Sequence, residues 1–327
     1  MIIARTPFRV SFVGGGSDLP AFYTRRPGCV VSVSINRHMY VSVHRFFEGG
    51  QYHLKYSKVE LAHSLEEIHH PIIREALKLA GITGGIELTS TADIPAGTGL
   101  GSSSSFAVGV LHALYAYQGI FVSKERLAGE ACAIEIEKLG ELIGKQDQYA
   151  AAFGGLNFIQ FHQDERVTVE PIVLDRQTME HLQTSLMLFY IGGTRASGEI
   201  LRRQSRNMTD QASFDLVSRM TELAERLRDQ LREKRCDDFA AILHQAWELK
   251  RSVAAGITDT RIDALYSRAL KAGAQGGKLL GAGGSGFILL YCPLERQARV
   301  REELAELRLF PFRFDMDGSR LIYVGEN

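Results

Sequence analysis

The chain has 327 residues, which is long for a single hydrophobic core and sufficient for two domains. Apolar residues make up 45% and charged residues 23%, as in ordinary globular proteins. Because 38 basic side chains balance 38 acidic ones, no overall field attracts nucleic acid or an anionic membrane, and any phosphate must be bound locally.

The spacing of the cysteines and the hydropathy of the chain argue against further classes of protein, namely zinc-binding, disulfide-rich, membrane-spanning and secreted ones. The four cysteines are far apart and form no Cys-x-x-Cys pair, which argues against a zinc site or a disulfide framework and favours buried thiols in a reducing compartment. We find neither an apolar run of the ~18 residues that a membrane span needs nor a signal peptide. We therefore expect a cytoplasmic protein with no membrane or nucleic-acid partner.

The first half of the chain mixes strands and helices. Ser123 is the expected N-cap of one helix, and Gly81, Gly119 and Gly140 are the expected helix stops. Alternating and β-branched residues predict strands at 9–13, 30–44 (bent or paired), 85–91 and 156–162. Apolar periodicity predicts helices at 71–80, 102–118 and 124–139.

The second half is expected to begin after the polar stretch 163–166, so we predict domains at 1–165 and 166–327. No flexible linker separates them, which indicates a large shared interface. Strands are predicted at 167–173, 185–191 and 287–291, helices within 216–231, 239–249, 262–272 and 294–307, and a closing hairpin of 312–315 with 321–324 around Asp317-Gly318.

A glycine- and serine-rich segment, 95–105, follows one predicted strand and opens the helix at 102. Its glycines allow a ligand close to the backbone, and the exposed N–H groups of a first helical turn attract anions. A flexible turn with a serine cap is the alternative, although one serine would suffice for a cap. We predict ATP and phosphate binding by Pro95, Gly97, Thr98, Gly99, Leu100, Gly101, Ser102, Ser103 and Ser104.

Two further glycine-rich segments are less specific. Residues 281–286 match Gly-x-Gly-x-x-Gly, but a helix is expected before them and a strand after them, which is the reverse of a dinucleotide fingerprint. They are interpreted as a helix-to-strand turn or as a second backbone wall beside the phosphate segment. Residues 13–18 combine three glycines with Asp18, which could accept hydrogen bonds from hydroxyls or simply cap a helix.

Together these segments resemble the three motifs of the GHMP kinases, in the same order and across nearly the whole chain: 7–18, 95–104 and 278–286. The resemblance implies an α+β, two-domain GHMP kinase fold. Its N-terminal domain is similar to ribosomal protein S5 domain 2, and its C-terminal domain is ferredoxin-like. It also implies ATP and Mg²⁺ as cofactors and an active site between the domains.

The segments 12–20, 54–57 and 144–149 resemble, within this family, the heptose kinases. Those enzymes phosphorylate the anomeric C1 hydroxyl of D-glycero-D-manno-heptose 7-phosphate in the synthesis of nucleotide-activated heptose for capsule, lipopolysaccharide or S-layer glycans. The resemblance therefore implies a sugar phosphate and ATP as the small-molecule partners. It leaves the oligomeric state open, and a homodimer stays an alternative.

The resemblance also implies roles for single residues. Asp147 matches the catalytic aspartate of the family and could accept the proton of a hydroxyl, or cap the short helix that follows it. Arg9 matches the basic residue of the first motif, and Lys145 could act in the same way or be a solvated lysine. Ser103 and Glu135 are the expected Mg²⁺ ligands, with Glu137 as the alternative carboxylate.

The sugar phosphate needs acceptors for its hydroxyls and a separate anion site. Expected substrate-binding residues are Gly15, Gly16, Ser17, Asp18, Gly283 and Gly284. Arginines hold phosphate well, so Arg195, after two glycines, is favoured slightly over Arg202 and Arg203 for a remote phosphate. Alternatives are a fucokinase or galactokinase, a nucleotide- or sugar-gated binding protein on the same fold and, on residues 281–286 alone, a nicotinamide oxidoreductase.

Overall fold

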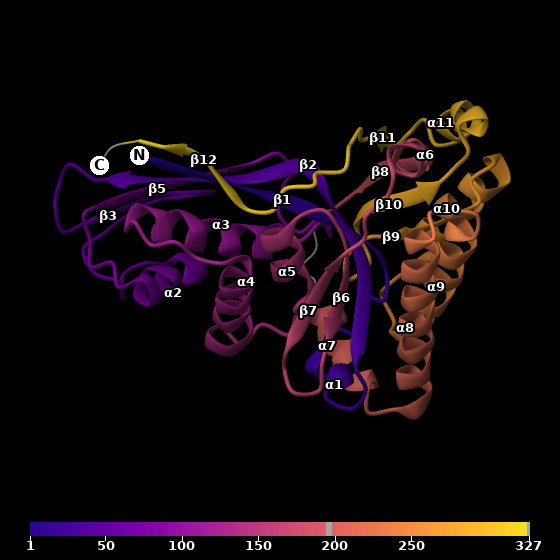
Figure 1. Cartoon of the computed structure of the whole chain (residues 1–327), viewed down its shortest axis with the longest axis horizontal. Helices are drawn as coiled ribbons and strands as arrows, with labels where there is room; N and C mark the ends of the chain where they lie inside the picture. Colours follow the sequence, from indigo (N-terminus) through magenta and orange to yellow (C-terminus); the bar gives the residue numbers. More distant parts are fainter. Residues whose placement is uncertain (194–197, 326–327) are drawn as a thin grey trace.

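The computed structural model describes residues 1–193 and 198–325. Two layered parts lie side by side, and each is built on its own sheet (Figure 1). Within the described residues, no helix combines the length and the apolar character that crossing a membrane requires.

The first sheet has the order β12-β1-β2-β5-β3-β4, and β6 and β7 extend it beside β2. Strand β2 bends, so that residues 28–33 pair with β6 while residues 39–45 pair with β5. The bounds are β1 Ile2–Val13, β2 Gly28–Arg45, β3 Tyr52–Lys55, β4 Val59–Ala62, β5 Ile86–Ala92, β6 Leu156–Phe161, β7 Val167–Pro171 and β12 Arg320–Val324.

Helices of the first half cover one face of this sheet (Figure 1). Helix α3 packs against β1 and β2 on one side and α2, α4 and α5 on the other, which explains why it is apolar nearly all round. The bounds are α1 Pro20–Tyr23, α2 Pro71–Ala80, α3 Ser102–Tyr117, α4 Lys124–Cys132, a π-helical turn η1 Ala133–Lys138 and α5 Gln146–Phe153.

The second sheet is antiparallel, with the order β11-β8-β10-β9, and α9 and α10 pack on β9. Its strands are β8 Leu186–Gly192, β9 Gly276–Leu279, β10 Gly286–Tyr291 and β11 Arg308–Leu309. The helices are α6 Arg176–Ser185, α7 Gly198–Asn207, α8 Gln211–Arg232, α9 Phe239–Val253, α10 Thr260–Ala272, the 3-10 turn η2 Leu294–Arg296 and α11 Gln297–Glu303.

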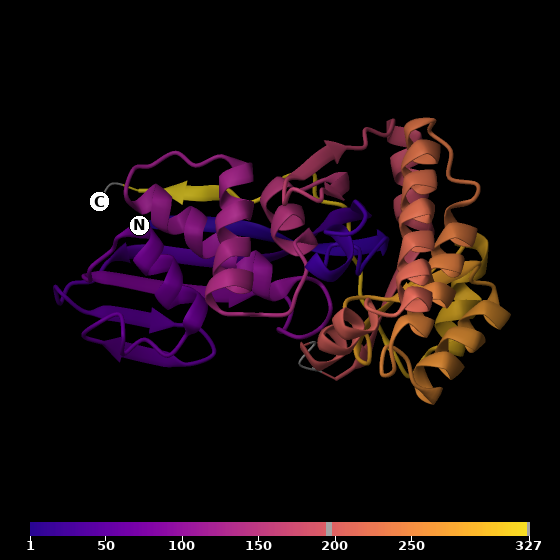
Figure 2. The same cartoon turned by 90° about the horizontal axis from the view of Figure 1, so that it is seen from below.

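The two parts share an apolar interface. Helix α8 packs against β1 and β2, and α9 packs against β1, where the rings of Phe12 and Phe239 meet edge to face with centroids 5.1 Å apart. One hydrophobic cluster contains residues of both parts. Figure 2 shows the orange helices α8 and α9 lying beside the end of the first sheet. The large interface expected from the absence of a linker is therefore present.

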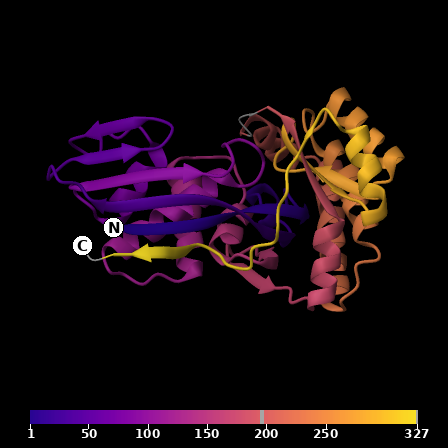
Figure 3. The ribbon, with the colours of Figure 1, turned by 90° about the horizontal axis from the view of Figure 1, so that it is seen from above.

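The chain end returns to the first sheet, where β12 pairs antiparallel with β1 and the two termini lie together (Figure 3). The expected hairpin of 312–315 with 321–324 is therefore wrong, because Phe314 instead bridges Ile35. Strands β7 and β12 both belong to the first sheet although they follow residue 165. The division at that residue stays a prediction, and the sheet crosses it.

Two predicted helices differ in detail. The helix expected at 124–139 is α-helical only to Cys132 and continues as the π-turn η1, while Ser123 caps it as expected by accepting from the backbone N–H of Arg126. The helix expected at 294–307 is shorter and begins as a 3-10 turn. The loop 280–285 joins β9 to β10, so a strand rather than a helix precedes it.

Candidate active site

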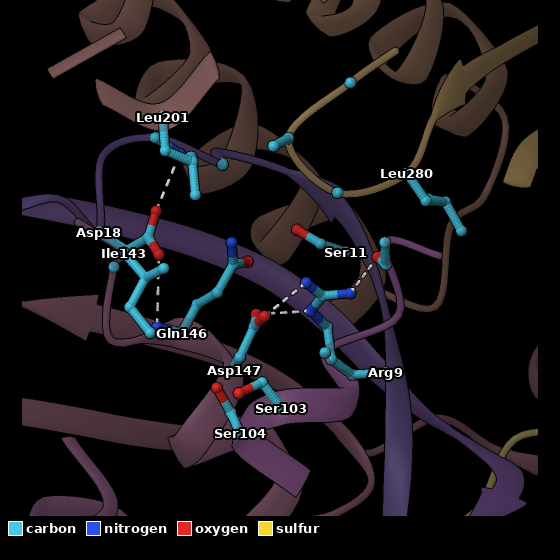
Figure 4. Close-up of a pocket in the computed structure, with 18 of the residues that line it drawn as sticks. Arg9, Ser11, Asp18, Ser103, Ser104, Ile143, Gln146, Asp147, Leu201 and Leu280 are labelled. Carbon is cyan, nitrogen blue, oxygen red and sulfur yellow. Dashed lines mark hydrogen bonds and ion pairs between the residues drawn. The ribbon is translucent and has the colours of Figure 1, made fainter. Parts of the chain in front are cut away.

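A pocket of about 380 Å³ is lined by residues from both parts of the molecule (Figure 4). Strand β1 and the loop after it supply one wall, and the loop before α3 supplies a second. The loop between β9 and β10, with α9, supplies a third. Expected residues that line it are Arg9, Gly15, Gly16, Asp18, Gly97, Gly99, Gly101, Ser102, Ser103, Ser104, Glu135, Asp147 and Gly283.

The loop before α3 has the geometry of an anion site. Gly97, Gly99 and Gly101 all have φ between +77° and +84°, a region that favours glycine. Gly101 is the N-cap of α3, and no side chain caps the helix there. The N–H groups of the first turn thus face the pocket without a side-chain acceptor, at the positive end of the helix dipole.

The loop 95–101 before α3, which we call the phosphate loop after its expected role, and the β9–β10 loop touch through their backbones. A Cβ on Gly99 would lie 2.5 Å from the carbonyl oxygen of Leu280, and one on Gly281 would lie 2.5 Å from Cα of Gly99. The second backbone wall expected from the sequence is therefore present. Pro95, Thr98 and Leu100 do not line the pocket: the Thr98 hydroxyl donates to the Pro95 carbonyl.

Arg9 and Asp147 form a bidentate ion pair inside the pocket (Figure 4). Nε and one terminal nitrogen of Arg9 donate to the two carboxylate oxygens at 2.7 and 2.8 Å, and the other terminal nitrogen donates to the Gly99 carbonyl at 2.7 Å. One guanidinium thus orients the carboxylate and ties it to the phosphate loop. Asp147 lies in the first turn of α5, whose N-cap is Lys145, so the alternative of Asp147 as N-cap is wrong.

Ser103 and Glu135 meet as expected. The Ser103 hydroxyl donates to one carboxylate oxygen of Glu135 at 2.6 Å, and the Gln148 amide donates to the other at 2.7 Å. Burial, despite these hydrogen bonds, raises the pKa of Glu135 above its ordinary value. Glu135 lies in the π-turn η1, a distortion that is frequent at functional sites. Glu137, the alternative, is exposed.

These oxygens fit a magnesium ion that also binds nucleotide phosphate. Mg²⁺ is commonly held by one or two carboxylates, phosphate oxygens and water. Among the described residues there is no group of three or more His, Cys, Asp or Glu that could hold a metal ion. A magnesium site made of one carboxylate, a hydroxyl and phosphate oxygens does not need such a group.

Asp18 lies on the other side of Gln146 from Asp147 (Figure 4). It accepts from the backbone N–H of Gly16 at 2.9 Å and of Gln146 at 3.4 Å. Burial, followed by the negative charge of Asp147, raises the pKa of Asp18, and the Gly16 N–H and Lys250 act against that rise. The two carboxylates therefore face the same pocket from neighbouring positions.

Besides Pro95, Thr98 and Leu100, three more expected residues do not line the pocket. Lys145 forms an ion pair with Glu165 and lies over the ring of Tyr23, so its side chain is engaged elsewhere. The Ser17 hydroxyl is buried against the backbone of Cys29, and the Gly284 N–H donates to the Ile257 carbonyl. Arg195 lies outside the described residues.

The sequence interpretation missed several polar residues of this site. Ser11 and Gln146 line the pocket, and the Ser11 hydroxyl and the Gln146 side-chain carbonyl are buried without a hydrogen-bond partner. Lys250 and Lys278 line it too. A signal for Lys250 existed, because it lies four residues after Ala246 and thus continues the buried face of α9.

Comparisons with known proteins agree with this geometry. The family description "GHMP kinases N terminal domain" matches residues 65–155, and "GHMP kinases C terminal" matches residues 202–308, together more than half of the chain. D-glycero-alpha-D-manno-heptose 7-phosphate kinase of Campylobacter jejuni is 27% identical over 304 residues, which cover 89% of each protein.

Other similar proteins carry sugar-kinase names or share the fold. The bifunctional fucokinase/GDP-fucose pyrophosphorylase of Arabidopsis thaliana is 26% identical over 92% of this chain, which spans 31% of that longer protein. The crystal structure of a D-glycero-D-manno-heptose 1-phosphate kinase from Bacteriodes thetaiotaomicron superposes with a TM-score of 0.82 at 24% identity, covering 100% of both chains.

The two-domain fold, the matching family descriptions and the kinase relatives define an ATP-dependent phosphotransferase, that is, a kinase. The chain belongs to the GHMP kinases. The α+β, two-domain GHMP kinase fold expected from the sequence is confirmed, and so is its class as an enzyme.

Proposed function

We propose that this kinase transfers the γ-phosphoryl group of ATP to the anomeric C1 hydroxyl of D-glycero-D-manno-heptose 7-phosphate. The product is the 1,7-bisphosphate, an intermediate on the way to nucleotide-activated heptose for surface glycans. One observation carries the reaction class: Asp147, oriented by Arg9, lies at the mouth of the anion site that opens α3. The relative from Campylobacter jejuni supports the substrate.

ATP binds, in this proposal, with its phosphates against the backbone N–H groups of Ser102, Ser103 and Ser104. The positive end of the α3 dipole stabilises them there. Gly97, Gly99 and Gly101 leave room for the phosphates, while Pro95, Thr98 and Leu100 support the loop from behind. Ser103 and Glu135 hold Mg²⁺, which supplies charge neutralisation when bound.

The sugar lies between Asp147 and Asp18. Asp147 accepts the proton of the attacking hydroxyl, and Arg9 keeps its carboxylate aimed at that hydroxyl. Asp18 accepts hydrogen bonds from other sugar hydroxyls, with Gly15, Gly16 and Gly283 allowing the ring close to the backbone. Because Lys145 is paired with Glu165, it has no catalytic role in the proposal.

A fucokinase or galactokinase activity is the second candidate, because the fucokinase relatives match more than 90% of this chain. In a nucleotide- or sugar-gated binding protein on the same fold, Asp147 would catalyse no phosphoryl transfer. A nicotinamide oxidoreductase is not supported, because residues 281–286 join two strands and open no helix.

The test is a coupled assay of ADP release over a panel of sugars and sugar phosphates, with the phosphorylated position of the product read by NMR. We expect turnover with D-glycero-D-manno-heptose 7-phosphate and a new phosphate on C1. Faster turnover with fucose or galactose would favour the second candidate. ATP binding without turnover on any sugar would favour a binding protein.

A further inference from the structure

Two buried lysines of the second part of the molecule reach into the first. Lys250, near the end of α9, donates to the Gly15 carbonyl at 3.1 Å and to the side-chain oxygen of Gln204 at 2.9 Å. Lys278, on β9, donates to the Phe12 carbonyl at 3.1 Å. Each lysine is only 8% exposed, and both line the pocket.

Neither ammonium group has a close counter-ion. No carboxylate of the described residues lies within 4 Å of either lysine nitrogen. The carboxylate of Asp147 is paired with Arg9, and the charge of Asp18 acts on Lys250 only from a greater distance. An ammonium group has three N–H donors. Lys278 uses one of them and Lys250 uses two, so three buried N–H donors stay unmatched.

Two more unmatched donors lie close by. The Ser11 hydroxyl, next to Phe12 in the chain, has no partner, and neither has the side-chain nitrogen of Gln204. That nitrogen lies 2.0 Å from where a Cβ on Gly16 would stand, and the Lys250 nitrogen lies 3.4 Å from the same point. The buried donors therefore surround the segment 11–16.

Burial lowers the pKa of Lys250 to about 8 and that of Lys278 to about 7, so this place favours an acceptor-rich anion that restores their positive charge and receives their free N–H donors. Burying an unpaired ammonium group is costly, and a neutral donor would satisfy the same backbone carbonyls without that cost. A phosphate monoester offers two negative charges and only acceptors when it is fully ionised. It would match the two lysines and the Ser11 hydroxyl, which all line the pocket.

We infer that Lys250 and Lys278 form the subsite for the phosphate that the sugar substrate already carries. Both bond carbonyls of the segment that leads to Asp18, not those of the loop 95–104, so they lie on the sugar side of the pocket. This subsite deepens the proposed function and rests on it. It is proposed in place of the arginines expected for this phosphate: Arg202 and Arg203 are exposed on α7, and Arg195 lies outside the described residues.

The test compares heptose 7-phosphate with the same heptose lacking the phosphate, in the wild type and in the variants Lys250→Met and Lys278→Met. We expect each variant to raise KM for heptose 7-phosphate at least 30-fold. KM for the unphosphorylated heptose and for ATP should change less than threefold. Lys271→Met, which removes an exposed lysine of α10, is the control and should change none of them.

The outcomes separate the two proposals. If the wild type does not prefer the phosphorylated sugar, the proposed function fails whatever the variants do. If it does prefer that sugar and the variants keep the preference, only the lysine subsite fails. A rise confined to KM for ATP would assign the lysines to the nucleotide and would equally overturn the subsite.

If the lysine variants do not fold, a measurement on the wild type tests the same subsite. Burial, with the charges of Lys250 and Arg9, lowers the pKa of Lys278 to about 7. A bound dianion should raise it again, so binding at pH 8 should take up a proton. Calorimetry in two buffers of different ionisation enthalpy should show this uptake with heptose 7-phosphate and not with the unphosphorylated sugar. Equal uptake with both, or none, would contradict the subsite.

Discussion

At the scale of single residues, the proposed chemistry depends on how firmly two carboxylates are held. Asp147 receives two hydrogen bonds from one guanidinium, a planar fork that fixes its orientation more strictly than a lysine could. Glu135 receives one hydrogen bond on each oxygen and is nearly inaccessible. Such preorganisation is what positions a proton acceptor and a metal ligand before the substrates arrive.

Replacing Asp147 with asparagine should abolish most turnover, because an amide cannot accept the proton of the hydroxyl. We expect kcat to fall by about 10²–10⁴, the usual contribution of a general base, while the Kd for ATP stays within about twofold. Steady-state kinetics and calorimetry measure the two quantities. Asp237→Asn removes an exposed carboxylate as the control. Turnover within tenfold of the wild type would contradict the role of Asp147.

Replacing Glu135 with glutamine should weaken magnesium binding, because the amide keeps the shape but loses the charge. We expect the Mg²⁺ concentration for half-maximal activity to rise at least about tenfold, about 1.4 kcal/mol or more. The measurement is a magnesium titration of activity at saturating ATP. Glu137→Gln, two residues along on the exposed face, should leave the titration unchanged. Identical titrations for both variants would exclude Glu135 as a ligand.

At the scale of elements, the site depends on two glycine-rich loops that meet without side chains. The phosphate loop and the β9–β10 loop come from different parts of the molecule, and their backbones touch at Gly99 and Gly281. A Cβ at either position would push the loops apart. The contact thus couples the anion site at the start of α3 to the second sheet.

Replacing Gly99 with alanine should therefore cost more than backbone strain alone. Gly119 is the matched control: its φ is +72° against +84° for Gly99, but nothing lies within 4 Å of its would-be Cβ. We expect Gly119→Ala to lower the free energy of unfolding by about 1 kcal/mol and to keep ATP binding. Gly99→Ala should lose stability further and weaken ATP binding at least about tenfold. Equal effects in thermal denaturation and ATP calorimetry would contradict the loop contact.

At the scale of the whole molecule, the last residues of the chain fasten the two parts together. After β11 the chain leaves the second sheet, bridges Ile35 through Phe314, and ends as β12 beside β1. Asp315 anchors this crossing segment by accepting from His38 at 2.6 Å, with Arg5 at 3.6 Å. The first sheet is therefore complete only when the chain end is present.

The anchor at Asp315 predicts a pH dependence of stability. Burial acts to raise its pKa, but the hydrogen bonds from His38 and Asp317 N–H and the charges of His38 and Arg5 outweigh it. The pKa therefore lies below the ordinary 3.8. A lowered pKa in the folded state stabilises the protein at neutral pH, and this contribution is lost as the pH falls below about 4.

Asp315→Asn should consequently be less stable than the wild type at pH 7, and this deficit should shrink between pH 5 and pH 3. Thermal denaturation across that range measures it. Asp317→Asn, at an exposed neighbour, is the control and should keep the pH profile of the wild type. A deficit that stays constant with pH would contradict the anchoring role of the Asp315 charge.

What the sequence by itself determined follows from local patterns. Three glycine-rich motifs in order predicted the family and the fold. Periodicity predicted α3, α8, α9 and α10 but not α6 or α7, and Ser123 predicted a cap that is present. Residues within these motifs, such as Arg9 and Ser103, were found because their positions are set by short stretches of chain.

Only the tertiary structure decided what depends on residues far apart in the chain. The sequence alone could not show that β12 pairs with β1, that Lys145 turns to Glu165, or that Lys250 and Lys278 reach carbonyls more than 200 residues away. A β-strand has no preferred partner in its own residues, since pairing follows from burial on the assembled sheet. A buried lysine likewise becomes a site only when packing places it against another part of the molecule.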